Sequence, residues 1–350
     1  MSAHKITIQQ IADRLGVSKY TVSQALSGKE GISEATRRQV LETAKSMGYK
    51  QRRQVYDREA PQTGIASDAA TSPYVIIWIP YRERGETEFW QRVLSGIVAG
   101  CDERNWEHII LSPYDYQGRL VVLPPYLDTS TCLGGLSIGS FPLTTIHAYV
   151  QTKLPVVLID HDERFADLDA VVNNNLEAAH LLLTHMAESG CEKLIFVGQD
   201  HFSVSFRERW WGCKMGIEAL TGTSGAKISL RKWSIPYSET DWLQVLSSML
   251  DRLEPQDWPH GFIGANDHIA MELQALLVAK GIDIPAQCKV AGFDNIRSAG
   301  SASPPLTTVD LGKEELGIRA IEALEKRISH PDRPRERISL SPQLVVRLSC

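Results

Sequence analysis

The first 50 residues contain three short stretches in which apolar residues recur every three or four positions, the spacing that places them on one face of a helix. Thr7, Ser18 and Ser33 precede the three stretches, and each is a residue type that caps a helix N-terminus. Gly16 and Gly28 follow the first and second stretches, where glycine commonly ends a helix. The pattern predicts three helices around one small core. The apolar positions that predict this core are Ile8, Ile11, Ala12, Leu15, Val22, Leu26, Val40, Leu41, Ala44 and Met47.

The turn between the first two helices, Leu15 to Ser18, has the length found in a helix-turn-helix. The face of the second helix that is left out of the core offers amide, hydroxyl and ammonium groups, which suit base edges and phosphates in a major groove. An ordinary polar surface has a similar composition, so this pattern leaves both interpretations open. The candidate DNA-binding residues of this region are Thr7, Ser18, Lys19, Tyr20, Thr21, Ser23 and Gln24.

Beyond residue 73, apolar runs of strand length alternate with amphipathic runs of helix length, which is typical of a mainly parallel α/β sheet. The alternation restarts after Val171, so two similar lobes are predicted. The predicted strands are 75–80, 108–113, 134–140, 154–160, 193–199, 261–267 and 289–295, and the predicted helices are 89–106, 176–190, 206–220 and 269–281.

Charge is distributed unevenly along the 350 residues. Residues 1–60 contain 11 Lys and Arg against 6 Asp and Glu, whereas the remaining residues contain 26 against 36. The N-terminal part therefore suits a polyanion and the body does not. Between them, residues 51–73 contain Pro, Gly, Ser and Thr without a periodic apolar stripe, which indicates a linker.

Several classes of protein are disfavoured. No apolar run reaches the roughly 18 residues of a membrane helix, and no signal peptide follows the start, so a cytoplasmic protein without a membrane partner is expected. The six cysteines are scattered without a C-x-x-C pair, which suggests neither a zinc site nor a disulfide framework. No G-x-G-x-x-G or P-loop opens a helix, so no cofactor is expected.

Two local patterns suggest catalysis or metal binding and are set aside. Residues 135–139, GLSIG, match the G-x-S-x-G pattern of a hydrolase nucleophile, but Phe141-Pro142 follows where the elbow would need a helix. His161-Asp162-Glu163 contains metal-ligand types, but adjacent residues on a loop rarely converge on one ion. We therefore expect no catalytic residue, Ser137 included, and no metal site.

Residues 6–49 resemble the head of the LacI/GalR family of bacterial repressors, whose pattern is close to VTIxDVAxxAGVSxxTVSRVLNG followed by VSxxTRxRVxxAxxELGY. The resemblance continues through the body in EKLIFVGQ, ANDHIAMELQALLVAKGIDIP, VAGFDN and SPQLVVRLS. It implies a transcriptional regulator of the repressor type that binds a double-stranded DNA operator as a homodimer. It also implies a small-molecule effector, a sugar or sugar derivative, held between two lobes.

The resemblance implies an α/β fold with an N-terminal three-helix helix-turn-helix head and a two-lobed, periplasmic-binding-protein-like body with parallel sheets. The expected head is 1–50, the hinge 51–73, and the effector-binding and dimerisation domain 74–350. Its first lobe is expected at 74–172 and 302–335, and its second at 173–301 and 336–350.

The hinge departs from the family's pattern, P-N-x-x-A-x-x-L, whose leucine wedges into the minor groove. Arg58 stands in place of that leucine. A guanidinium there is expected to contact phosphate instead of inserting between bases, so Arg58 is a further candidate DNA-binding residue.

In the resembled architecture the ligand lies at the carboxyl ends of the strands. Aromatic faces suit the C–H groups of a polyol, while carboxylate, amide and guanidinium groups suit its adjacent hydroxyls. Acids and amides at strand ends also cap the following helix, so some of them have only a structural role. The candidate effector-binding residues are Phe89, Trp90, Asp160, His161, Arg209, Asn266 and Asp294.

Two other classes of function remain to be weighed. A body that docks a protein partner would have its cleft filled by bulky side chains, and Trp210-Trp211 beside Arg209 keeps this class open. An enzyme on a binding-protein scaffold is disfavoured, because the sequence shows no nucleophile with its base and no set of metal ligands.

Overall fold

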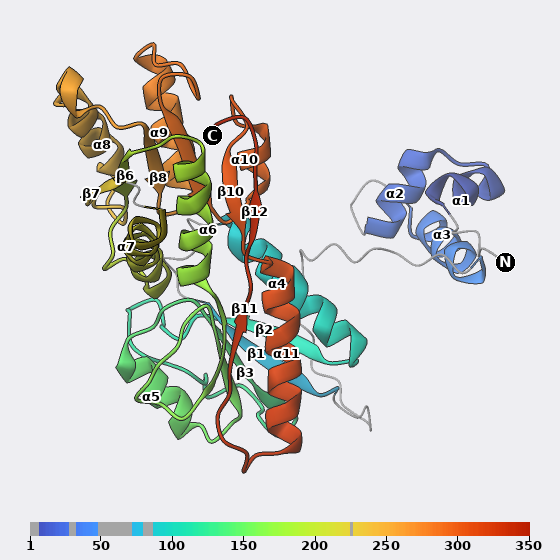
Figure 1. The fold of residues 1–350 in the computed structure, drawn as a ribbon. Helices are drawn as coiled ribbons and strands as arrows, with labels where there is room; N and C mark the ends of the chain where they lie inside the picture. Colours follow the sequence, from blue (N-terminus) through green and yellow to red (C-terminus); the bar gives the residue numbers. More distant parts are fainter. Residues whose placement is uncertain (1–6, 28–32, 48–71, 80–86, 225–226) are drawn as a thin grey trace. The chain divides into compact units, whose positions relative to one another are not determined.

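The computed structural model describes residues 7–27, 33–47, 72–79, 87–224 and 227–350. The chain divides into two compact units, residues 1–69 and 70–350. The first unit is called the head and the second the body; Figure 1 shows the helices and strands of each. Each unit has its own hydrophobic core.

The head consists of α1 (Ile8–Leu15), α2 (Lys19–Ser27) and α3 (Glu34–Ser46), which confirms the three predicted helices. Thr7 and Gln10 form a capping box at the start of α1, in which each side chain bonds the backbone of the other residue. Gly16 ends α1 with a φ of 68°, a left-handed conformation that glycine adopts without strain. These local signals fix the sharp turn into α2.

The core of the head is built from one apolar stripe per helix, and its buried residues are Ile11, Ala12, Val22, Ala25, Val40 and Ala44. Leu41 was predicted in this core, and that prediction is wrong because its side chain is 46% exposed. Val40, Ala44 and Met47 follow the spacing of one helix face, and Leu41 lies about 100° further round the helix.

In the described residues the body contains two six-stranded sheets. The alternation along the sequence correctly predicts two lobes, but it predicts only seven of these twelve strands and misses β5, β7, β10, β11 and β12. Each sheet with the helices that pack on it is called a lobe. The first sheet has the order β11-β5-β4-β3-β1-β2 with all neighbours parallel, and the second has the order β12-β10-β9-β8-β6-β7, in which only β12 is antiparallel to its neighbour.

The strands of the first sheet are β1 (Tyr74–Trp78), β2 (Glu107–Leu111), β3 (Cys132–Ile138), β4 (Val156–Ile159), β5 (Asp169–Asn173) and β11 (Arg337–Leu340). Those of the second are β6 (Lys193–Val197), β7 (Ser229–Trp233), β8 (Gly261–Gly264), β9 (Lys289–Phe293), β10 (Thr307–Asp310) and β12 (Gln343–Val345).

Helices cover both faces of each sheet, which is why the central strands are apolar on both sides. On β1, Val75 and Ile77 face the core formed with α4 (Thr87–Glu103) and α11 (Lys313–Ser329), whereas Ile76 faces α5 (Leu143–Gln151). The helices of the second lobe are α6 (Asn175–Glu188), α7 (Val204–Ser224), α8 (Trp242–Asp251), α9 (Asp267–Ala279) and the short α10 (Arg297–Ser301). Among the described residues, no helix is long and apolar enough to span a membrane.

The chain crosses between the lobes three times, once after β5, once after β10 and once between β11 and β12. The expected lobe boundaries are therefore wrong at two strands: β10, within 302–335, belongs to the second sheet, and β11, within 336–350, belongs to the first. The reason is that β10 completes the parallel run beside β9, while β11 pairs with β5 on the far edge of the other sheet. The expected bounds of head and hinge remain a prediction.

Two helices of the first lobe pack backbone to backbone. A Cβ at Gly96 of α4 would lie 1.9 Å from the carbonyl oxygen of Glu314 on α11, and one at Gly317 would lie 2.2 Å from that of Val93. Only a residue without a side chain permits this approach, so α4 and α11 are locked to one another along the core of the lobe.

We expect Gly96→Ala to destabilise the body by about 1–3 kcal/mol, because the new methyl group overlaps backbone atoms that cannot rotate away. Gly222→Ala on α7 is the matched control: nothing lies within 4 Å of its Cβ position, so only the higher helix propensity of alanine acts and stability rises by up to about 1 kcal/mol. Urea denaturation of the two variants measures both effects. Equal changes would mean that the α4–α11 contact is less tight than described.

Candidate functional site

The second head helix, α2, exposes the side chains that were predicted to contact DNA. Lys19 and Ser23 are exposed, Tyr20 is 72% exposed, and Gln24 is half-buried. Val22 and Ala25 on the opposite face are fully buried, so packing fixes which face of α2 is free. The position of α2 after a tight turn is that of a helix presented to a major groove.

Short hydrogen bonds organise this face. The amide nitrogen of Gln24 donates to the hydroxyl of Tyr20 at 2.9 Å, one helical turn away. Ser18 caps α2 by accepting from the backbone N–H of Thr21 at 3.0 Å, and the two hydroxyls are 2.8 Å apart. Ser18 and Thr21 thus hold the helix start, while Tyr20 and Gln24 are oriented as a pair.

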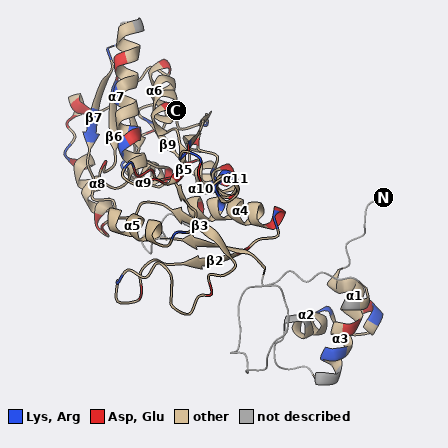
Figure 2. Ribbon diagram, turned by 90° about the horizontal axis from the view of Figure 1, so that it is seen from below, with Lys and Arg blue, Asp and Glu red and all other residues tan. Residues whose placement is uncertain are grey.

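Figure 2 shows both basic and acidic residues on the head helices. The described head contains five Lys and Arg and three Asp and Glu, so its excess of positive charge is small. Gly28 and Arg58, which were predicted as a helix end and a phosphate contact, lie outside the described residues.

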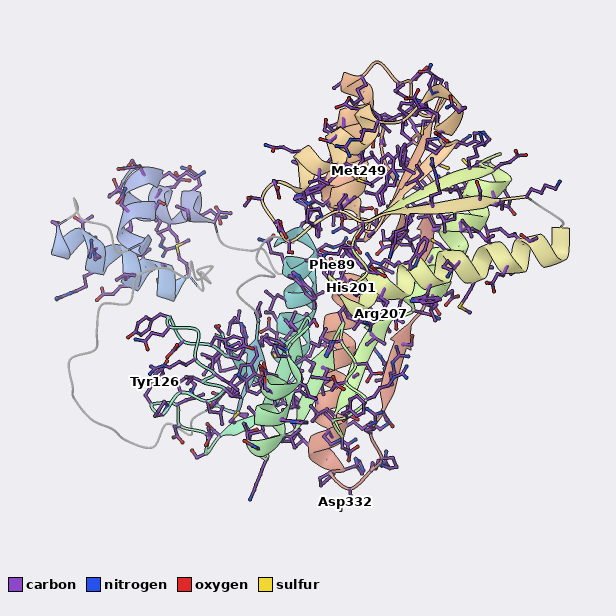
Figure 3. The ribbon with its side chains drawn as sticks, turned by 90° about the vertical axis from the view of Figure 1, so that its left-hand side faces the viewer. Phe89, Tyr126, His201, Arg207, Met249 and Asp332 are labelled. Carbon is purple, nitrogen blue, oxygen red and sulfur yellow. The ribbon has the colours of Figure 1, made fainter. Side chains whose placement is uncertain are left out.

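The second candidate site is a cleft between the two lobes of the body. It holds about 420 Å³ of empty space that is continuous with the solvent. Figure 3 labels Phe89 at the level where the lobes meet, with Met249 in the second lobe and Asp332 at the far end of the first. The cleft is lined by Phe89, Trp90, Gly139, Ser140, Asp160, Phe202, Ser203, Ser205, Phe206, Arg209 and Asp294.

Arg209 anchors one wall of this cleft and is only 3% exposed. Each of its three nitrogens has a partner: Nε donates to Asn175 Oδ1 at 3.0 Å, Nη1 to the Ala265 carbonyl at 2.6 Å, and Nη2 to Asp294 Oδ1 at 2.8 Å. The ring of Phe293 lies 5.0 Å from the guanidinium carbon. The positive charge of Arg209 is therefore balanced within the protein by Asp294.

Asp160 lies at the end of β4 and has no salt bridge among the described residues. Ser205 donates to its Oδ2 at 3.1 Å, and Asn173 donates to its Oδ1 at 3.4 Å. Burial raises the pKa of Asp160 to about 6, and the charge of Arg209 only partly opposes this. Burial also raises the pKa of Asp294, again against the attraction of Arg209.

The backbone at both cleft carboxylates is in the left-handed region. The φ angles are 56° at Asp160 and 110° at Asp294, and neither residue is a glycine. Such conformations cost of order 1–3 kcal/mol each and cluster at functional sites. Here they turn the chain sharply at two strand ends and aim two carboxylates at one space.

Five of the seven candidate effector residues line this cleft, namely Phe89, Trp90, Asp160, Arg209 and Asp294. His161 does not: it is 6% exposed, and neither of its ring nitrogens has a hydrogen-bond partner in the described part of the chain. Asn266 caps α9, accepting from the Ile269 N–H at 2.9 Å, which is the structural role considered for strand-end amides.

The sequence interpretation missed the second lobe's contribution from the start of α7. Phe202, Ser203, Ser205 and Phe206 all line the cleft. A signal was available, since residues 201–206, HFSVSF, which follow β6 and continue into the first turn of α7, combine two phenylalanines with two serines near a strand end.

The competing catalytic and metal interpretations gain no support. Ser137 is fully buried within β3, where it could not attack a substrate in the cleft. Asp162 pairs with Arg335 and Arg337 instead of joining His161 around an ion. The described residues contain no group of three or more His, Cys, Asp or Glu that could hold a metal.

The body thus has a cleft of ligand size between its two lobes, and the separate head carries a helix-turn-helix. Family models agree: residues 7–51 match bacterial regulatory proteins of the lacI family, and residues 183–350 match the periplasmic binding protein-like domain. The chain belongs to the lacI family of bacterial regulatory proteins.

Curated relatives are regulators. The chain is 29% identical over 196 residues to the transcriptional repressor PurR of Mannheimia succiniciproducens, a stretch that covers 56% of this chain and 57% of the relative. It is 26% identical over 223 residues to the regulator GalR of Lacticaseibacillus casei, a stretch that covers 63% of this chain and 67% of the relative. The chain thus aligns with little more than half the length of the first of these relatives.

Solved structures share the fold. A regulator CelR in complex with cellobiose matches with a TM-score of 0.65 and 20% identity, covering 99% of this chain and 100% of the other. The lac repressor dimer bound to operator and the anti-inducer ONPF matches with a TM-score of 0.64 and 16% identity, covering 99% of each. An Enterococcus faecium regulator with bound ribose matches with a TM-score of 0.63 and 18% identity, covering 79% of this chain and 98% of the other.

Asp160 is expected to make stability depend on pH. Its folded pKa of about 6 lies above the ordinary 3.8, so the native state holds this proton more tightly than the unfolded state. Stability is lost as the pH rises from about 4 to about 6, and the ionised carboxylate remains a cost above that range. Asp160→Asn should therefore stabilise the protein, by up to about 3 kcal/mol above pH 6 and by less at lower pH.

Urea denaturation at pH 5.0 and pH 7.5 measures this difference. Asp332→Asn, at an exposed position of the first lobe, is the matched control for the same chemical change outside the cleft. A gain from Asp160→Asn that is the same at both pH values would contradict the assignment.

Proposed function

We propose that this protein is a sequence-specific DNA-binding transcriptional regulator of the repressor type, controlled by a small-molecule effector in the cleft of its body. The observation that carries the first half is the free polar face of α2, held rigid by its buried face and presented after a tight turn. Lys19, Tyr20 and Gln24 are its base-reading residues, and Ser18, Thr21, Ser23 and Thr7 contact phosphate or hold the helices.

The protein acts as a homodimer on a near-palindromic operator. One helix-turn-helix reads only a few base pairs, whereas two heads related by a twofold axis read two half-sites. The lac repressor structure that shares this fold is a dimer bound to operator, which supports the same arrangement here.

The effector is a neutral polyol of the sugar type. Arg209 is balanced by Asp294, so Asp160 contributes an unbalanced negative charge to the cleft. A ligand phosphate about 4 Å from this carboxylate would be repelled by about 4 kcal/mol at the effective dielectric of a partly buried site. Hydroxyl groups, in contrast, donate to carboxylate oxygens, and the rings of Phe89, Trp90 and Phe206 offer apolar faces.

Trp90 adds a second polar feature to this cleft. Its side chain is 6% exposed, and its indole nitrogen has no hydrogen-bond partner among the described residues. A buried donor without a partner costs stability unless a ligand or water satisfies it. A hydroxyl oxygen of the effector would accept this bond.

The cleft favours a small ligand over a protein partner. Trp210 packs on Phe196 of the second lobe's core, with ring centroids 5.6 Å apart, and does not line the cleft. The bulky pair Trp210-Trp211 thus does not fill the space between the lobes. The proposal includes no enzymatic activity for this protein.

We expect Gln24→Arg to move the preference of the half-site from A towards G at the position that residue 24 reads. The side-chain amide of Gln pairs with N6 and N7 of adenine, whereas Arg pairs with O6 and N7 of guanine, and each such pair discriminates by about 1–3 kcal/mol. Selection from random duplexes gives the two motifs. Gln9→Arg, the same change on the exposed side of α1, is the control, and a motif unchanged by Gln24→Arg would show that Gln24 reads no base.

Neutral sugars are expected to raise the melting temperature of the full chain more than their phosphorylated counterparts. Matched pairs such as ribose with ribose 5-phosphate and glucose with glucose 6-phosphate isolate the effect of the phosphate, because ligand binding to the folded state raises its stability. In Asp160→Asn, the rise in melting temperature should differ less between the two members of a pair than in the unchanged protein. A larger shift with the phosphorylated member would contradict a neutral effector.

A further inference from the structure

The two lobes are joined by side-chain contacts in addition to the three chain crossings. The most direct contact starts from Glu88, in the first turn of α4 in the first lobe. Its carboxylate accepts from the backbone N–H of Arg297 and from the hydroxyl of Ser298, the latter at 3.1 Å, and both belong to α10 of the second lobe. One carboxylate therefore holds two donors across the gap between the lobes.

Arg92 reinforces this contact one helical turn further along α4. Its Nη1 donates to the carbonyl oxygen of Asn295 in the second lobe at 3.4 Å, while its Nε bonds Glu314 on α11 of the first. Because α4 and α11 are locked by their glycines, Glu88 and Arg92 project from a rigid support.

A second contact crosses the middle of the cleft. Ser205, at the start of α7 in the second lobe, is 6% exposed and donates to Oδ2 of Asp160 in the first lobe at 3.1 Å. Oδ1 of the same carboxylate accepts from Asn173. The hydroxyl of Ser205 thus occupies the position on Asp160 that a hydroxyl of a polyol would take.

A weaker contact lies between β11 of the first lobe and α7. Arg337 of the first lobe is 3.7 Å from Glu208 of the second, but its side chain is 48% exposed and also pairs with Asp162. An exposed ion pair of this length contributes little.

Lys313, at the start of α11, also donates to the Asp294 carbonyl and to Asp310, the latter at 3.0 Å, but it lies next to the crossing from β10 to α11, where the chain itself joins the lobes. Away from the crossings, the contacts that hold the lobes are therefore those of Glu88, supported by Arg92, and of Ser205.

We propose that the body closes its own cleft without a ligand, through Glu88 and Ser205, and that an effector acts by replacing Ser205 on Asp160. This inference rests on the proposed function in taking the cleft as the effector site. It changes the direction of control. A ligand that favours only the closed arrangement of the lobes cannot shift the equilibrium between open and closed molecules further when the body is already closed. Control then requires an effector whose interactions favour the other arrangement of the lobes.

The test measures the distance between the lobes in the full chain without effector or DNA. Nitroxide labels at Thr144→Cys on α5 and Gln244→Cys on α8, both exposed, report on the first and second lobe (Figure 1). Cys132 and Cys350, which are only partly buried, are replaced by Ser so that they take no label. Pulsed electron spin resonance gives the distribution of distances.

We expect one short-distance population in the otherwise unchanged protein. Glu88→Ala together with Ser205→Ala should lower the ratio of closed to open molecules roughly tenfold, since hydrogen bonds to charged groups are among the stronger ones. The matched controls are Glu103→Ala, whose partner Arg104 lies in the same lobe, and Ser95→Ala, whose hydroxyl bonds the Gln91 carbonyl of its own helix. Neither control should change the distribution.

Three results would overturn the proposal: an open majority in the unchanged protein, a distribution that the double variant leaves as it was, or controls that open the lobes as much as the double variant. None of these bears on whether the head binds DNA or whether sugars bind the cleft. The proposed function is therefore tested separately from this inference.

Discussion

The cleft of the body depends on the need to balance one buried guanidinium. Arg209 is almost completely removed from water, and a charge in that position is tolerated only when its donors are used. Its partners come from the start of α6, the end of β8 and the end of β9, so satisfying Arg209 brings three strand-to-helix junctions together. The wall that faces the ligand space follows from this convergence, and replacing Asp294 would leave the guanidinium buried and unpaired.

The chemistry of the cleft could be predicted from the sequence only in part. The ends of strands can be predicted from apolar runs, which is why Asp160 and Asp294 were correctly placed at the same cleft. The sequence did not show that Asp160 lines the cleft and its neighbour His161 does not. The difference arises from the left-handed backbone at Asp160, which turns the chain so that His161 does not line the cleft. Ser205 and Phe206 were missed although the stretch HFSVSF contains suitable side chains, because no local pattern shows that the other lobe approaches this stretch.

The same limit explains the errors in the fold. Helix caps and apolar stripes are local, and they predicted α1, α2 and α3 closely. The sheet to which a strand belongs is a long-range choice. Strands β11 and β12 are short, partly exposed edge strands separated by residues 341–342, and nothing in their composition shows that they join different sheets.

The three crossings also determine when the lobes can be completed during synthesis. The first lobe needs α11 for its core and β11 for its edge, and the second needs β12, so neither sheet is complete until almost the whole chain has left the ribosome. Until then, the apolar face that α11 covers is exposed on the nascent chain, a condition that favours aggregation and calls for chaperones. The head has no such delay, because its core closes within its first 47 residues. A ribosome translating this protein therefore carries a finished head attached to an unfinished body for most of the time of synthesis.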